Sequence, residues 1–178
     1  MFTGHCGTTV AYMSQRTTAP ERNVERPARL ELAELAPEAY KAMIALDGAA
    51  RRGLDPVVAE LVKIRASQLN HCAFCLDMHT KDALAAGESV ERIIQLSAWE
   101  ESLHFYSAKE VAALELTEAM TVLTDGFVPD DVYARAAAEF DETELAHLIV
   151  AITVINAWNR FGVTSRLAPG HYTPARHG

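Results

Sequence analysis

The chain has little cysteine, with three residues among 178. That number is odd and too small for the disulfide framework of a small secreted domain. In a reducing compartment, a C-x-x-C pair is instead typical of a redox or metal site. The start of the chain also lacks a basic segment followed by an apolar run of signal-peptide length. We therefore expect a cytoplasmic protein.

The chain also lacks an excess of positive charge and a long hydrophobic run. It carries 16 Lys+Arg against 24 Asp+Glu, for a net charge of -8. Without a basic patch, nucleic acid is not an expected partner. The longest apolar run, residues 145–158, contains His147 and Asn156 and is too short to span a bilayer, so we expect no membrane association.

Strand signals are missing as well, because no alternation of apolar and polar residues is long enough to indicate them. Helix signals follow one another closely instead. Asp55 before Pro56 is typical of a helix start, and residues 107–110 and 141–144 have the spacing of capping boxes. We predict an all-α fold, a compact bundle of about six to eight helices, with enough apolar residues for a sizeable core.

The length suits one domain, which we place at residues 29–178. Residues 1–28 are expected to be a flexible N-terminal tail. Met13 would be an equally ordinary start, so residues 1–12 are interpreted as an extension or a start-site artefact, and Cys6 as a bystander thiol.

Two helical segments have distinctive apolar faces. A helix that opens at Pro37 places Tyr40, Met43 and Ile44 on one stripe, which we predict to be core. Residues 144–162 are apolar on most sides, so this helix is predicted to be buried or to lie at a subunit interface.

The residues that carry chemistry lie within one short stretch. Cys72 and Cys75 form a C-x-x-C pair, and in a helix that begins at Cys72 they share one face with His79. The unpaired N–H groups and the positive dipole end of a first helical turn favour a thiolate over a thiol. A reactive cysteine is therefore expected here.

A carboxylate can reach this site only if the chain reverses. Glu60 precedes Cys72 by twelve positions, roughly 18 Å along a continuous helix. A turn within residues 68–71 would form an antiparallel helix hairpin and bring Glu60 level with His79. The carboxylate would then orient the imidazole.

These residues, with the run LVKIRASQLNHCAFCLDMHTKDALAAG, resemble the core of the alkylhydroperoxidase D / carboxymuconolactone decarboxylase family. The close resemblance covers residues 54–87, and VINAWNRFG at 154–162 is a looser match. It implies an alkylhydroperoxidase D-like fold in which a catalytic helix hairpin carries the C-x-x-C pair.

The resemblance implies a thiol-dependent peroxidase that uses no bound cofactor. Cys75 would attack a hydroperoxide, Cys72 would resolve the product as a disulfide, and Glu60 and His79 would form a proton relay. The family also implies a lipoyl or thioredoxin-like dithiol reductant as partner. It further implies a homo-oligomer, a trimer or a hexamer.

One position departs from alkylhydroperoxidase D, which resembles C-x-H-C where this chain has Phe74. A histidine stands instead at His71, and this difference bears on the efficiency of peroxide reduction. We expect His71 and Phe74 to line the pocket, together with Asn156 and Trp158 from the helix beside the cysteines. Structural hydrogen bonding is the competing interpretation for buried polar groups such as Asn156.

Other functions stay open at this point. The same residues suit a thiol-disulfide oxidoreductase of unknown substrate, and the family name also covers a decarboxylase of lactone acids, which does not depend on a C-x-x-C pair. A non-catalytic zinc-binding or oligomeric module could use the thiolates, imidazole and carboxylate as ligands. Structural zinc sites usually take a second ligand pair from a distant hairpin, which Cys6 does not provide, so we predict no metal.

Overall fold

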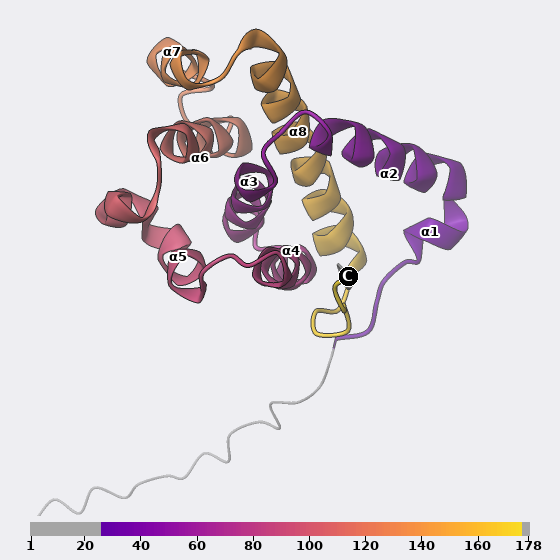
Figure 1. The fold of residues 1–178 in the computed structure, drawn as a ribbon. Helices are drawn as coiled ribbons and strands as arrows, with labels where there is room; N and C mark the ends of the chain where they lie inside the picture. Colours follow the sequence, from indigo (N-terminus) through magenta and orange to yellow (C-terminus); the bar gives the residue numbers. More distant parts are fainter. Residues whose placement is uncertain (1–25, 176–178) are drawn as a thin grey trace, which may run out of the picture.

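The computed structural model describes residues 26–175. The regular secondary structure in that part consists of helices joined by loops (Figure 1). The elements are α1 (Leu32–Leu35), α2 (Pro37–Arg51), α3 (Pro56–Leu69), α4 (Ala73–Ala85), α5 (Val90–Gln95), the 3-10 segment η1 (Leu96–Phe105), α6 (Ala108–Thr121), α7 (Asp130–Glu139) and α8 (Glu142–Ser165). The predicted all-α bundle is confirmed. Residues 1–25 of the expected tail, with Cys6, lie outside the described residues, as do residues 176–178.

The helix boundaries follow the capping signals. The Asp55 side chain accepts hydrogen bonds from the first turn of α3, which has proline at its first position. Both predicted capping boxes are present, one at the start of α6 and one at the start of α8. Each such cap satisfies N–H groups that the helix itself leaves unpaired.

The centre of the bundle is α3, which packs against α4, α6 and α8. The long helix α8 runs beside α3 and α4 and also contacts α2 (Figure 1). Leu148, Ile152 and Ile155 of α8 are fully buried, which confirms the predicted burial of this helix. Among the described residues, none of the helices combines the length and apolar character that a membrane crossing requires.

The predicted core stripe of α2 is wrong in part. Tyr40 and Met43 are only half-buried and Ile44 is 54% exposed, whereas the buried residue of this helix is Ala50. The reason is the position of α2, which lies at the edge of the bundle and packs mainly on α8 (Figure 1). One flank of its apolar stripe therefore stays open.

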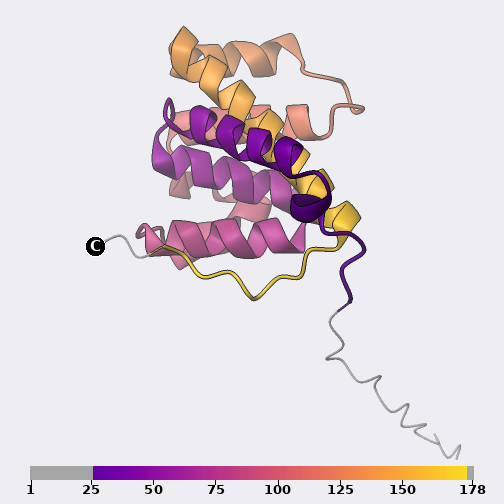
Figure 2. The ribbon, with the colours of Figure 1, turned by 90° about the vertical axis from the view of Figure 1, so that its right-hand side faces the viewer.

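The chain after α8 folds back along α4 (Figure 2). The Lys81 ammonium donates to the carbonyl of Tyr172, the Gly170 N–H donates to Asp77, and the Tyr172 hydroxyl donates to Asp82 at 2.7 Å. These hydrogen bonds fix the C-terminal segment, residues 166–175, beside the helix that carries the cysteines.

Candidate redox site

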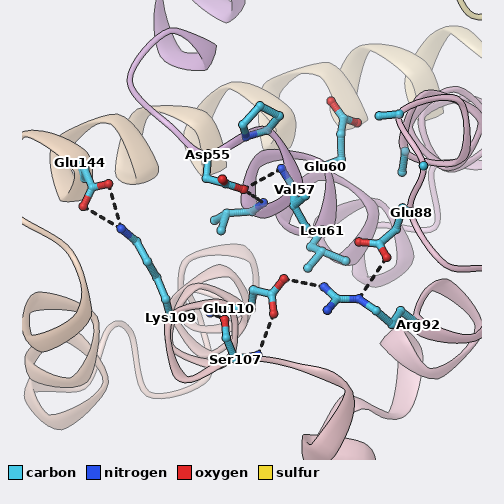
Figure 3. A pocket seen from close by; sticks show the side chains of 15 residues that line it. Asp55, Val57, Glu60, Leu61, Glu88, Arg92, Ser107, Lys109, Glu110 and Glu144 are labelled. Carbon is cyan, nitrogen blue, oxygen red and sulfur yellow. Dashed lines mark hydrogen bonds and ion pairs between the residues drawn. The ribbon is translucent and has the colours of Figure 1, made fainter.

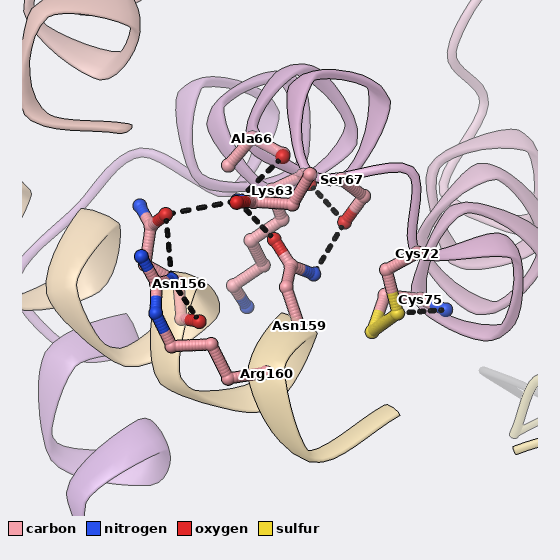
Figure 4. The surroundings of a disulfide bond; sticks show 9 residues. Lys63, Ala66, Ser67, Cys72, Cys75, Asn156, Asn159 and Arg160 are labelled. Carbon is pink, nitrogen blue, oxygen red and sulfur yellow. Dashed lines mark hydrogen bonds between the residues drawn. A yellow bond between two sulfur atoms is a disulfide. The ribbon is translucent and has the colours of Figure 1, made fainter. Parts of the chain in front are cut away.

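The turn between α3 and α4 is held in one conformation. His71 has a positive φ of 54°, and the Cys72 N–H donates to the carbonyl of Ser67. The Asn70 amide donates to the side-chain oxygens of Asn156 and Asn159 on α8, at 2.9 and 3.0 Å (Figure 4). The chain therefore reverses where the sequence predicted, and three asparagines join the turn to α8.

The two cysteines lie at the start of α4. Cys72 is the N-cap residue rather than the first helical residue, and its sulfur accepts a hydrogen bond from the Cys75 N–H at 3.4 Å. The two sulfurs are paired as a disulfide, with Cα atoms 5.4 Å apart, within the usual range (Figure 4). Both residues are buried, at 1% and 3% exposed.

Helix α8 approaches the disulfide at a glycine. A Cβ atom at Gly162 would lie 2.7 Å from the sulfur of Cys72 and 3.5 Å from that of Cys75. The first distance is too short for a carbon–sulfur contact, so any side chain here would displace the disulfide or the helix. The looser sequence match at 154–162 thus includes a residue that the packing of the sulfurs requires.

Glu60 and His79 meet across the hairpin. The carboxylate lies 2.9 Å from the imidazole Nδ1, and His79 is buried at 2% exposed. Burial raises the pKa of Glu60, but the hydrogen bond and charge of His79, with the charges of Lys63 and Arg51, outweigh it. The pKa of Glu60 is therefore held below its ordinary value. The carboxylate stays ionised and fixes the orientation of the imidazole.

A second set of charges surrounds Glu60, and the sequence reasoning missed it. Lys63 is 1% exposed, and its ammonium lies 3.5 Å from Glu60 and 3.9 Å from Asp47. Arg51 donates to Asp47 at 2.7 Å and lies 3.8 Å from Glu60. The spacings of Lys63 from Glu60, at i+3, and of Arg51 from Asp47, at i+4, are the sequence signal that could have found them.

A pocket of about 220 Å³ opens on the face of α4 that carries Cys75 and His79. Cys75 and His79 line it, whereas Cys72 does not. Its other walls come mainly from α2, α4 and α8 and are largely aromatic or apolar. They are Tyr40, Ile44, Asp47, Arg51, Phe74, Met78, Trp158 and Leu167.

Two of the four predicted pocket residues are at this pocket. Phe74 lines it, and so does Trp158, whose ring meets Tyr40 edge-on with centroids 5.1 Å apart. The other two predictions are not met. The lining does not include His71, which is exposed in the turn, or Asn156, which is buried and donates to Thr121 and to the carbonyl of Ile152. Asn156 thus makes structural hydrogen bonds of the kind that the competing interpretation describes.

A larger pocket of about 670 Å³ lies at the other end of α3, between α4, α5 and α6 (Figure 3). Several of its charged groups are paired: Arg92 with Glu88 and Glu110, and Lys109 with both oxygens of Glu144 at 2.8 Å. Glu60, the partner of His79, also lines this pocket. The residues that line it include no cysteine or histidine. Size alone therefore does not identify the reactive site.

Three residues of the described part have potential metal-ligand atoms within 4.8 Å of one another, Glu60, His79 and Asp82. These atoms are already used, since Glu60 bonds His79 and Asp82 accepts the Tyr172 hydroxyl. The hypothesis of a zinc site used thiolate ligands, whereas the sulfurs here are joined to each other. We assign no metal to this group.

Known proteins match both the sequence and the fold. The sequence profile of the Carboxymuconolactone decarboxylase family matches residues 37–119, which span α2 to α6 and hold every polar group of the hairpin site. The chain belongs to the carboxymuconolactone decarboxylase family. The resemblance first seen in the hairpin sequence is thereby confirmed.

Relatives in this family extend the match beyond the hairpin. The uncharacterized protein YdfG of Bacillus subtilis is 43% identical over 76% of this chain and 92% of its own length. The uncharacterized protein YnjA of Escherichia coli is 35% identical over 62% of this chain and 60% of its own length. Neither name assigns an activity.

A solved family structure has the same fold. It is a crystal structure from Agrobacterium tumefaciens of a protein of unknown function, described as a candidate antioxidant defence protein, AhpD. The two chains are 37% identical, with a TM-score of 0.78 over 82% of this chain and all of the other. The predicted alkylhydroperoxidase D-like fold is therefore confirmed.

Proposed function

We propose that the chain is a thiol-dependent peroxidase that reduces organic hydroperoxides. The observation that carries the proposal is the joint placement of Cys75 and His79 on one pocket wall, with Glu60 hydrogen-bonded behind the imidazole. A nucleophile, a base and a residue that orients the base are the parts that such a reaction needs.

The reaction begins from the reduced dithiol. The Cys75 thiolate attacks the terminal oxygen of R–O–O–H, the O–O bond breaks, and the alkoxide leaves as an alcohol with a proton supplied by the relay. Cys75 becomes a sulfenic acid. Cys72 then attacks its sulfur, water leaves, and the Cys72–Cys75 disulfide forms. The sum is one hydroperoxide and two thiols converted to one alcohol, one water and one disulfide.

Exposure to the pocket supports Cys75 as the attacking residue. Cys75 lines the cavity, whereas Cys72 lies behind it against Gly162. The hydrogen bond from the Cys75 N–H to the Cys72 sulfur suits a resolving thiolate at the helix N-cap. Return to the dithiol requires two electrons and two protons, which we assign to an external dithiol of the lipoyl or thioredoxin type.

The apolar walls of the pocket favour an organic hydroperoxide over hydrogen peroxide, because Tyr40, Phe74 and Trp158 offer contact area to an alkyl or aryl group. Phe74 in particular contributes no proton donor where alkylhydroperoxidase D has histidine. Proton transfer is therefore assigned to the His79–Glu60 pair alone.

The test is thiol titration and intact mass of the reduced protein before and after one equivalent of tert-butyl hydroperoxide. We expect the wild type to lose two thiols and about 2 Da, and Cys72→Ser to accumulate a trappable sulfenic acid at Cys75. Cys75→Ser should retain its remaining site thiol. Survival of both thiols in excess peroxide would refute the peroxidase proposal.

The same disulfide also supports a second function, thiol-disulfide exchange with a protein or small dithiol substrate. It would be favoured if peroxide leaves the thiols intact while a dithiol reduces the disulfide rapidly. Turnover of a lactone acid, or stoichiometric zinc in the purified protein, would instead support the decarboxylase or the zinc-binding function.

We further propose a homo-oligomer, a trimer or a hexamer, formed in the cytoplasm. Leu35, Ile44 and Leu46 on α1 and α2 are 45–68% exposed, and exposed apolar side chains of this kind are what a second copy would cover. Light scattering measures the assembly, and a stable monomer would contradict it.

A further inference from the structure

Lys63 is the most unusual charged residue of the fold. Its side chain is 1% exposed, and its ammonium makes no hydrogen bond of regular geometry within the described part of the chain. A buried ammonium costs several kcal/mol unless charges or hydrogen bonds compensate for it. An apolar residue of similar length would avoid that cost, so a functional reason is needed.

The groups around Lys63 point to that reason. Its ammonium faces the Glu60 carboxylate at 3.5 Å on its own helix and Asp47 at 3.9 Å on α2. Glu60 in turn holds His79, which lines the pocket beside Cys75. Lys63 thus contacts the relay at Glu60 and does not itself line the pocket.

We propose that Lys63 is a positioning residue that keeps Glu60 ionised and aimed at His79, so that the imidazolium and the Cys75 thiolate can form together. This inference rests on the proposed thiol chemistry but not on peroxide as the substrate. Arg51 is a weaker candidate for the same task, since it is 44% exposed, lies 3.8 Å from Glu60 and already bonds Asp47.

The buried environment of Lys63 predicts that its removal has a large effect on the protonation of Glu60. A charge pair at 3.5 Å interacts far more strongly where water is excluded than at a surface. The other charged or titratable groups near the pair are Asp47 and Arg51 on α2, Asp82 on α4 and Tyr172 in the C-terminal segment. With Lys63 removed, burial would favour the protonated form of Glu60, and the imidazolium would lose its counter-charge.

The experiment measures the pH dependence of Cys75 alkylation by iodoacetamide in the reduced protein. Cys72→Ser serves as the background, and peptide mass spectrometry separates Cys75 from Cys6. We expect Lys63→Met to raise the midpoint of the profile by about one pH unit or more, and to slow alkylation at pH 7 about tenfold. Lys63→Arg, which retains the charge, should return the midpoint toward that of the parent protein.

Lys109→Met is the matched control. It removes an ammonium that bonds Glu144 at the larger pocket, and it should leave the midpoint unchanged. A Lys63→Met protein with a native helical circular dichroism spectrum and an unchanged midpoint would overturn the proposal. A purely structural lysine would lower the melting temperature and leave the profile in place.

Asp47→Asn gives a second measurement if Lys63→Met does not fold. This change removes the carboxylate that competes with Glu60 for the ammonium, so the midpoint should move in the opposite direction, to lower pH. An upward shift or no shift would contradict the proposed role. Because the readout is alkylation, an enzyme that proves inert to hydroperoxide would still report on Lys63.

Discussion

The pocket lined by Cys75 and His79 and the larger pocket at the start of α3 differ in their charges as well as in their size. At the larger pocket, Lys109 is one-third exposed and bonds both oxygens of Glu144. Behind the smaller one, Lys63 is fully buried and sits between two carboxylates without a regular hydrogen bond. Lys63 and Glu60 lie on α3 and are largely buried, whereas Lys109 of α6 and Glu144 of α8 are each about one-third exposed.

The difference indicates which kind of charged site supports acid-base chemistry. Paired surface charges contribute about 1 kcal/mol or less and leave each group with its ordinary chemistry. Buried and incompletely compensated charges shift protonation equilibria, which is what acid-base chemistry needs. The smaller pocket places His79, which such charges support, beside a disulfide, whereas the ion pairs at the larger pocket are partly exposed and border a larger volume.

The largest expected effect comes from removing the carboxylate behind His79. Glu60→Gln can keep a hydrogen bond to the imidazole but removes the charge that stabilises the imidazolium, so the reaction of Cys75 with tert-butyl hydroperoxide should slow roughly a hundredfold. Stopped-flow tryptophan fluorescence can follow this reaction. Glu144→Gln at the larger pocket is the control and should keep the wild-type rate, and equal losses in both variants would erase the proposed distinction between the pockets.

An intermediate effect is expected from a methyl group beside the disulfide and from one at the larger pocket. Gly162→Ala places a Cβ atom 2.7 Å from the Cys72 sulfur, so the oxidised protein should lose roughly 1–3 kcal/mol of stability through overpacking. In the reduced protein the Cys72 side chain can rotate away, and the loss should shrink. Urea unfolding of both redox states gives the two values.

Gly87→Ala tests the larger pocket in the same way. Gly87 lines that pocket and has a positive φ of 97°. No atom lies within 4 Å of the position that a Cβ atom would take there. Alanine there is strained by its backbone alone, by about 1–2 kcal/mol, and the strain should be the same in both redox states. A redox-independent loss for Gly162→Ala would show that the disulfide does not depend on this glycine.

The sequence predicted the hairpin well because its signals are local. The Asp55 cap, the turn after Leu69 and the register of Cys72, Cys75 and His79 all depend on spacing within one or two helices. Helical spacing and a single reversal are enough to bring Glu60 to His79.

The missed features depend on which helices become neighbours. Asp47 and Arg51 reach the site only because α2 packs across α8 beside the hairpin. No sequence signal within α2 predicts where this helix packs. Tyr172 reaches Asp82 because the chain folds back 90 residues later. His71 was expected to line the pocket, but the turn directs it outward, where it is exposed.

The smallest expected effect is a change in the stability of the fold at alkaline pH. The hydrogen bond to Asp82, followed by burial, raises the pKa of Tyr172 to about 12 from its ordinary 10, so folding favours the protonated phenol. The stabilisation is complete below pH 10 and is lost as pH rises from 10 through 12. The urea midpoint of the wild type should therefore exceed that of Tyr172→Phe below pH 10, and the difference between the two midpoints should narrow above pH 10.

Burial lowers the pKa of Arg92, but the hydrogen bond and charge of Glu110 outweigh it and hold this pKa above its ordinary value. The Arg92–Glu110 pair of the larger pocket therefore keeps both charges over this range. Tyr133→Phe on the exposed side of α7 is the control, and a difference between wild type and Tyr172→Phe that stays constant up to pH 12 would show that the bond to Asp82 does not stabilise the fold.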